Sequence, residues 1–185
     1  MKTYTGRYIN PLKLKPSDIA IEDIAHHLSN ICRFNGACTF HYSVAQHSCY
    51  VASICKLDPM AGLLHDASEA YLMDIPRPIK YTPEFEFYRK LEAEVQGMIN
   101  ECFGLPEQYP QTVKDADNAM LVAEGIQLMN ELFTDFGDPA QCEIVEITPR
   151  QAKQYFLKAY QDILFGKAEQ KVALQRRAVP SKGMH

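Results

Sequence analysis

An adjacent histidine and aspartate, His65 and Asp66, interrupt an otherwise apolar helical segment, GLLHDASEAY. The preceding Ala61, Leu63 and Leu64 direct this segment toward a core. Burying charge is costly unless the charge is paired or bound to a metal, and imidazole and carboxylate groups are good ligands for divalent metals. Because neighbouring helical residues diverge by about 100°, a metal site here needs further ligands from other helices. The pair therefore favours a bundle of helices around a metal.

Two further residues fit this requirement. His47 lies in SVAQHSCYVAS, which is flanked by apolar helical positions, and Asp117 lies in VKDADNAMLVAEG, between Val113 and Met120. Asp115 is a rival for the role of Asp117. Two histidines and two aspartates from three helices would form a site in the core of a bundle. A divalent ion at such a site lowers the pKa of water and neutralises charge on a phosphate.

Charged residues near the pair could complete a catalytic site. Glu69 comes four residues after His65, so both lie on one helix face. There it could act as a general acid or base, or orient an attacking water. Asp74 lies just past the same helix, at the mouth of the proposed site. Arginine suits bidentate phosphate binding, and lysine supplies a point charge. The nearest basic residues in sequence are Arg33, Arg77 and Lys80.

Each of these residues also has an ordinary structural interpretation. A single His-Asp pair occurs often by chance, and an isolated His47 or Asp117 would more often be structural or exposed. Arg33 could complement a helix dipole, while Arg77 and Lys80 could be surface charges. Four candidate ligands in apolar settings on three helices nevertheless favour a metal site. The remaining histidines, which we interpret as structural, loop or surface residues, are His26, His27 and His41.

Hydrophobic periodicity predicts an all-α fold of roughly six helices. The first begins at Ser17 or Asp18 and is broken at Asn35-Gly36; the others begin near Ser43 and at Pro59, and span about 82–103, 111–132 and 148–165. Residues 74–80 should be a loop, because they contain two prolines. Residues 3–9 and 142–147 could pair as a two-stranded ribbon. We expect one domain over residues 1–168 and a polar tail, loose or docking, over 169–185.

Composition excludes several classes of protein. A formal net charge of -4 indicates neither a nucleic-acid coat nor binding to an anionic membrane. The N-terminus has no apolar stretch typical of a signal peptide, and no apolar run approaches the roughly 18 residues of a membrane span. We therefore expect a cytoplasmic protein. The 6 cysteines form no CxxC pair, so reduced thiols are expected rather than a zinc-cysteine site.

The motifs ICRFNG, YSVAQHS, GLLHDASEAYLMDIPRPIK and VKDADNAML, in that order, resemble HD-domain phosphohydrolases related to the bacterial YfbR 5′-nucleotidase. They look especially like short phage versions, which include dATP triphosphohydrolases. The resemblance spans about residues 3–130. It implies an HD-type helical bundle and a dimer or hexamer. It also implies a Co, Mn, Zn or Mg ion bound by His47, His65, Asp66 and Asp117.

The resemblance further implies roles for the surrounding residues. Glu69 and Asp74 match carboxylates needed for catalysis, Arg33 matches an arginine that contacts phosphate, and Lys80 matches a basic residue beside the site. One position departs from the pattern. The bacterial nucleotidase has a tryptophan against the sugar where this chain has Phe34, which leaves selectivity for the deoxy sugar open.

The resulting hypothesis is an enzyme that removes 5′-phosphate groups from small 2′-deoxynucleotides, in the cytoplasm of a bacterium or a phage-infected host. A triphosphohydrolase acting on dATP is favoured, because the chain is short and phage-like. The first alternative is a 5′-deoxynucleotidase that acts on monophosphates. An alternative of another class is a catalytically silent HD domain that senses nucleotides.

Overall fold

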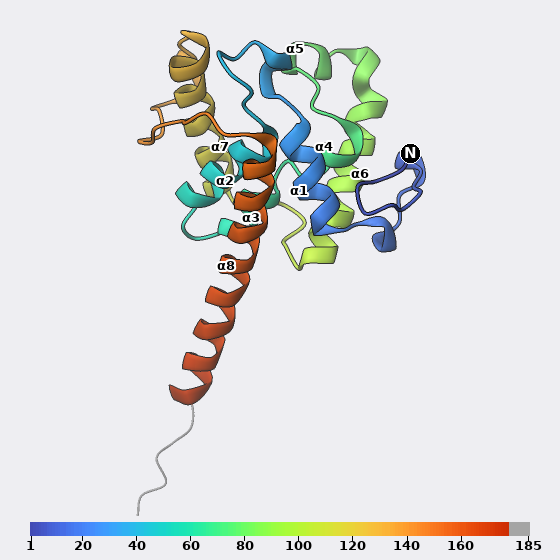
Figure 1. Ribbon diagram of the computed structural model, residues 1–185, viewed down its shortest axis with the longest axis vertical. Helices are drawn as coiled ribbons and strands as arrows, with labels where there is room; N and C mark the ends of the chain where they lie inside the picture. The colour runs from blue at the N-terminus through green and yellow to red at the C-terminus, as the bar shows by residue number, and fades with distance from the viewer. Residues whose placement is uncertain (178–185) are drawn as a thin grey trace, which may run out of the picture.

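The computed structural model describes residues 1–177 as an array of α-helices, as predicted (Figure 1). Residues 1–177 form no β-sheet, and two isolated bridges, Lys2 to Tyr8 and Cys32 to Ser43, are present. No helix in the described part of the chain is both long and apolar enough to cross a bilayer. The helices are α1 (Ile21–Asn30), α2 (Val44–Ile54), α3 (Pro59–Leu64), α4 (Glu69–Leu72), α5 (Arg77–Lys80), α6 (Glu86–Phe103), α7 (Gln111–Glu124) and α8 (Pro149–Arg177).

Helix α2 lies in the interior and contacts α3, α7 and α8. Its start is fixed by Ser43, whose hydroxyl accepts a hydrogen bond from the Gln46 amide at 3.2 Å. Helix α3 approaches α2 closely at Gly62, where an added Cβ would lie 3.1 Å from the Cα of Ala52. This close approach brings the residues that follow α3 next to α2, and His65 is the first of them.

The predicted ribbon is wrong, because other groups satisfy the backbone of both segments. The N-terminal segment folds on itself, and its Thr5 amide and hydroxyl donate to the buried Asp23 carboxylate of α1 at 2.7 and 2.8 Å. Residues 142–147 run as irregular chain. Side-chain amides replace a strand partner there. Gln46 donates to the Val145 carbonyl at 2.8 Å, and Gln127 accepts from the Ile144 amide at 2.9 Å.

Several helix boundaries also differ from the prediction. The segment from residue 59 to 72 is two helices, α3 and α4, joined by a turn at 65–68. Residues 77–80 form α5 rather than loop, because Pro78 occupies its first turn, where the missing N–H costs nothing. The helix predicted over 111–132 is α7 followed by a π-helical turn, Gly125–Met129. The predicted end of α6 is confirmed: Gly104 caps it with φ 63°.

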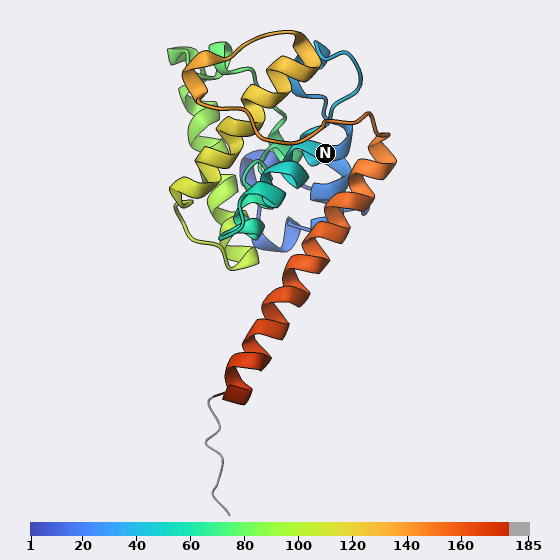
Figure 2. The ribbon, with the colours of Figure 1, turned by 90° about the vertical axis from the view of Figure 1, so that its left-hand side faces the viewer.

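Helix α8 packs its first half against α1, α2 and α3, and its second half projects away from the rest of the molecule (Figures 1 and 2). The prediction that Gly166 ends this helix is wrong, since α8 continues to Arg177. A glycine weakens a helix interior by only about 1 kcal/mol relative to alanine, so it does not impose an end. Of the predicted tail, residues 169–177 are helical and 178–185 lie outside the described residues.

Phe156 should anchor α8 to the bundle, because its side chain is 0% exposed. We expect Phe156→Ala to lower the free energy of unfolding by about 3–5 kcal/mol, measured by urea denaturation. Phe165→Ala makes the same change on the same helix at a position that is 69% exposed, and should cost far less. Equal losses in the two variants would contradict this account of how α8 docks.

Candidate metal centre

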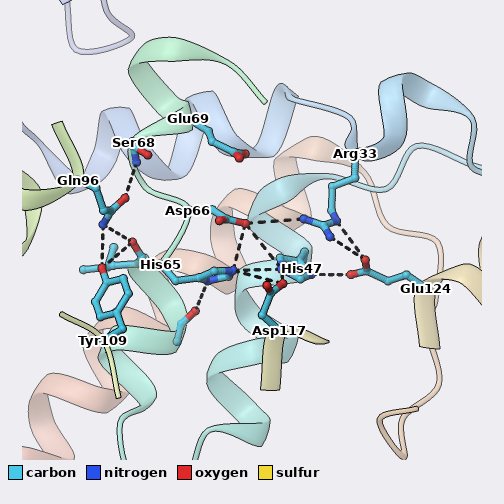
Figure 3. Close-up of polar contacts among 12 residues, drawn as sticks. Arg33, His47, His65, Asp66, Ser68, Glu69, Gln96, Tyr109, Asp117 and Glu124 are labelled. Carbon is cyan, nitrogen blue, oxygen red and sulfur yellow. Dashed lines mark hydrogen bonds and ion pairs between the residues drawn. The ribbon is translucent and has the colours of Figure 1, made fainter. Parts of the chain in front are cut away.

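Three side chains from separate elements converge in the middle of the bundle (Figure 3). His47 comes from α2, Asp117 from α7, and His65 directly follows α3. Their ligand atoms form a group that could hold a metal ion. The Nε2 atom of His47 lies 3.3 Å from Nε2 of His65 and 3.3 Å from Oδ1 of Asp117, and the third distance is 3.8 Å. Ligands about 2.1 Å from a tetrahedral ion would be about 3.4 Å apart, so this donor set fits one ion.

Asp66, the fourth predicted ligand, lies beside this group. Its Oδ2 atom is 3.1 Å from Nε2 of His65 and 3.7 Å from Nε2 of His47. The same oxygen lies 3.7 Å from Nη1 of Arg33. Asp66 therefore joins the histidine pair to the arginine that was predicted to contact phosphate.

The charges of the centre stabilise one another. Burial alone would raise the pKa of Asp117, but hydrogen bonds from His47 and His65 hold that pKa well below its usual range. Burial likewise opposes the ionisation of Asp66, and His65 outweighs it and lowers the pKa. Burial disfavours the charged form of His65, yet Asp66 and Asp117 raise its pKa well above the usual value. Both carboxylates are thus ionised at neutral pH, as metal ligation requires.

Each histidine ring is oriented by a partner on its far side. Nδ1 of His47 lies 2.6 Å from Oε1 of Glu124, and Nδ1 of His65 lies 2.9 Å from the Gly62 carbonyl oxygen. Because a carbonyl oxygen only accepts, Nδ1 of His65 is the donor, and its Nε2 faces the centre. Partners of this kind fix the tautomer and orientation of metal-binding histidines.

Glu124 is the main site residue that the sequence analysis missed. Its carboxylate is 0% exposed and accepts hydrogen bonds from the Tyr42 hydroxyl at 2.8 Å and from Arg33 at 2.9 and 3.2 Å. Burial raises the pKa of Glu124, but Arg33 and His47 outweigh burial and lower it. A signal was available, because Glu124 is a lone acid in the apolar run MLVAEG and follows Asp117 by two helical turns.

The two other predicted acidic residues lie on the α4 side of the centre. Glu69 is buried, and burial, Asp66 and Asp74 raise its pKa well above the usual value. Its Oε1 atom is 3.9 Å from Nζ of Lys80, while Oε2 has no hydrogen-bond partner among the described residues. Burial also raises the pKa of Asp74, against the effects of Arg33 and Lys80. Lys80 itself pairs with Glu92 at 2.8 Å, a residue that the sequence analysis did not identify.

The turn that carries His65 and Asp66 is held by side chains of and near α6 (Figure 3). Gln96 accepts a hydrogen bond from the Ser68 amide at 3.0 Å and donates to the Leu64 carbonyl at 2.9 Å. Gln96 also donates to the Tyr109 hydroxyl at 2.8 Å. These bonds brace both ends of the turn.

The three histidines that were interpreted as structural, loop or surface residues lie outside the centre, as does Asp115. His27 contacts the Ala70 carbonyl through Nδ1 at 2.7 Å, His26 stacks on Tyr4, and His41 contacts the Ser29 carbonyl. Asp115, the rival of Asp117, is exposed and accepts a hydrogen bond from Gln111. Arg77 lies near the centre, with Nη2 3.6 Å from Oδ2 of Asp117.

Fold and site together define an all-helical protein with a candidate metal centre made of two histidines and an aspartate. No family model matches the chain. The chain is 34% identical over 175 residues to the uncharacterized protein YfdR of Escherichia coli, covering 88% of this chain and 94% of YfdR. It is also 36% identical over 153 residues to the uncharacterized protein RCAP_rcc00048 of Rhodobacter capsulatus, covering 73% and 78% of the two chains. The chain belongs to the same family as YfdR. Neither name gives an activity.

Glu124→Gln tests the buried network. It removes the charge that Arg33 and His47 share, and it should lower the free energy of unfolding by about 3–5 kcal/mol in urea denaturation, because a buried arginine then lacks its carboxylate. Tyr42→Phe removes one hydrogen bond and should cost about 1 kcal/mol. Asp115→Asn changes an exposed acid on the same helix and should cost almost nothing. A Glu124→Gln protein as stable as the Asp115→Asn protein would contradict the network.

Proposed function

We propose that this protein is an HD-type phosphohydrolase that binds one divalent ion through His47, His65, Asp66 and Asp117 and removes 5′-phosphate groups from small 2′-deoxynucleotides. One observation carries the proposal: the Nε2 atoms of two histidines and Oδ1 of Asp117 lie 3.3–3.8 Å apart. Asp66 and Arg33 adjoin this group. Mixed imidazole and carboxylate donors suit Co, Mn or Zn, and the carboxylates also suit Mg. When bound, such an ion would act as a Lewis acid that lowers the pKa of water and neutralises charge on the phosphate.

Arg33 would bind the phosphate. Two of its guanidinium nitrogens, Nε and Nη2, are held by Glu124, while Nη1 lies toward Asp66. Burial opposes its charge, but Glu124 and Asp66 raise its pKa, so the guanidinium stays charged. A fixed planar donor at the edge of the metal group is suited to a phosphate oxygen.

Glu69 would act as the general acid that protonates the leaving 5′-oxygen. Cleavage of the 5′-ester forms a bond from a water oxygen to phosphorus, with loss of a proton from that water, and breaks the bond to the 5′-oxygen, which takes up a proton. Burial and the neighbouring Asp66 raise the pKa of Glu69, which favours its protonated form, and Oε2 has no partner among the described side chains. Lys80, 3.9 Å from Oε1, orients the group from the other side. Asp74, which is half-buried at the mouth of the proposed site, would lie beside Glu69 as a second acidic group.

Substrate choice within this class follows the family resemblance, which favours dATP and other deoxynucleoside triphosphates over monophosphates. A panel of dNMPs and dNTPs, each assayed with Mn, Co, Zn or Mg and analysed by product chromatography, separates the two. Tight nucleotide binding with no product under every condition would instead indicate the sensing alternative.

His65→Ala and Asp66→Ala should each lower phosphate or triphosphate release by at least about 10³-fold, because both remove a proposed metal ligand. Metal analysis should show less than one ion per chain in both variants. His26→Ala, which removes a histidine outside the centre, should keep both the ion and the activity. Unchanged turnover in His65→Ala or Asp66→Ala would reject the proposal.

Glu69→Gln should separate metal binding from proton transfer. The variant keeps the shape of the side chain but cannot give or take the proton, so kcat should fall by about 10²–10⁴-fold. The metal content should stay at that of the wild type, since Glu69 is not a proposed ligand. A kcat equal to that of the wild type would show that Glu69 has no part in proton transfer.

A further inference from the structure

Three phenylalanines from two loops form an aromatic cluster at the edge of the metal centre. The rings of Phe34 and Phe133 are parallel within 13°, with centroids 6.4 Å apart, and Phe136 meets Phe133 edge-on at 6.4 Å. All three are only half-buried, and none belongs to either hydrophobic core cluster of the described residues. This aromatic cluster therefore contributes little to the core, and its partial exposure needs another explanation.

Two arginines join the aromatic cluster to the charged centre. The guanidinium carbon of Arg33 lies 5.2 Å from the Phe34 ring centroid, and its Nη1 lies 3.7 Å from Asp66. Arg77 repeats the arrangement, 5.3 Å from the Phe136 ring centroid and 3.6 Å from Asp117. Each guanidinium thus lies near both an aromatic ring and a carboxylate of the centre. A ligand that binds both the charged centre and the aromatic cluster would carry a phosphate at one end and a flat apolar ring at the other.

The backbone holds these rings in position. Phe34 has a left-handed conformation, φ 53° and ψ 33°, which non-glycine residues rarely adopt and which often marks a ligand site. The Phe133 ring packs on Gly125, where an added Cβ would lie 2.6 Å from Cδ2 of Phe133 and 2.8 Å from the Glu131 carbonyl oxygen. Gly125 directly follows Glu124. The junction of α7 and the π-helical turn therefore has two roles. Glu124 orients His47, and Gly125 makes room for the Phe133 ring.

We propose that the aromatic cluster is a stacking platform for the nucleobase of the nucleotide whose phosphate Arg33 and the metal centre bind. This inference rests on the proposed function, and it adds the part of the substrate that the centre itself does not recognise. Stacking accepts every base, because each has a π-face, and it is stronger for the larger purines. The platform thus selects nucleotides over sugar phosphates that have no base.

A fluorescence titration tests this proposal without relying on turnover. The chain has 0 tryptophans, so Phe136→Trp introduces a single reporter in the platform. Its fluorescence should be quenched by dAMP immediately after mixing, in the metal-supplemented protein, and not by deoxyribose 5-phosphate. Phe165→Trp places the same reporter on the exposed face of α8 and should respond to neither compound. Absence of quenching by dAMP in Phe136→Trp would overturn the platform.

Binding to Phe133→Ala provides the second measurement. Its Kd for dAMP should rise about 10-fold or more, while its Kd for deoxyribose 5-phosphate should stay unchanged. Phe165→Ala should alter neither value. If dAMP and deoxyribose 5-phosphate bind the wild type equally and Phe133→Ala changes neither, the platform is rejected even where hydrolysis is observed. Base-dependent quenching and binding in a protein that hydrolyses no nucleotide would support the platform and reject the phosphohydrolase.

Discussion

The site depends on one buried carboxylate. Glu124 accepts hydrogen bonds from Tyr42 and Arg33 and contacts Nδ1 of His47, so a single ionised group joins α7, α2 and the loop after α1. A fully buried negative charge is tolerated only when its partners surround it. These partners are therefore as constrained as the carboxylate itself. Arg33 is held at the edge of the centre, and the His47 ring is turned so that Nε2 faces Asp117.

The close packing of α2 and α3 provides the second constraint. A Cβ at Gly62 would make a tight contact of 3.1 Å with Cα of Ala52, and the Gly62 carbonyl oxygen also accepts from Nδ1 of His65. One residue thus sets both the separation of the helices and the orientation of a candidate ligand. The distance of 3.3 Å between the two histidine Nε2 atoms follows from these two contacts together with Glu124.

The sequence predicts those parts of the site in which polar residues interrupt an apolar helix. His47, His65 and Asp117 could be identified in this way, because a charged group in such a position needs a partner. Glu124 satisfies the same criterion and follows Asp117 by two helical turns, but it belongs to no short motif that suggests ligation. The ribbon over 3–9 and 142–147 was wrong because strand-like composition does not reveal that Asp23, Gln46 and Gln127 would satisfy the backbone instead. Glu92 and Gln96, in α6, act through contacts across the fold that no local pattern specifies.

The aromatic cluster could not be predicted for a different reason. Phe34 sits in a left-handed turn, and Phe133 and Phe136 come from a segment without periodicity after α7, so no pattern links them. Phe133 packs on Gly125, and the arginines near the Phe34 and Phe136 rings also lie near carboxylates of the centre. A guanidinium attracts both a carboxylate and the face of an aromatic ring, so Arg33 and Arg77 stabilise a boundary between a charged and an apolar surface. A nucleotide has the same division, with a charged phosphate at one end and an aromatic base at the other. The boundary between the metal centre and the aromatic cluster therefore matches the class of molecule that we propose as the ligand.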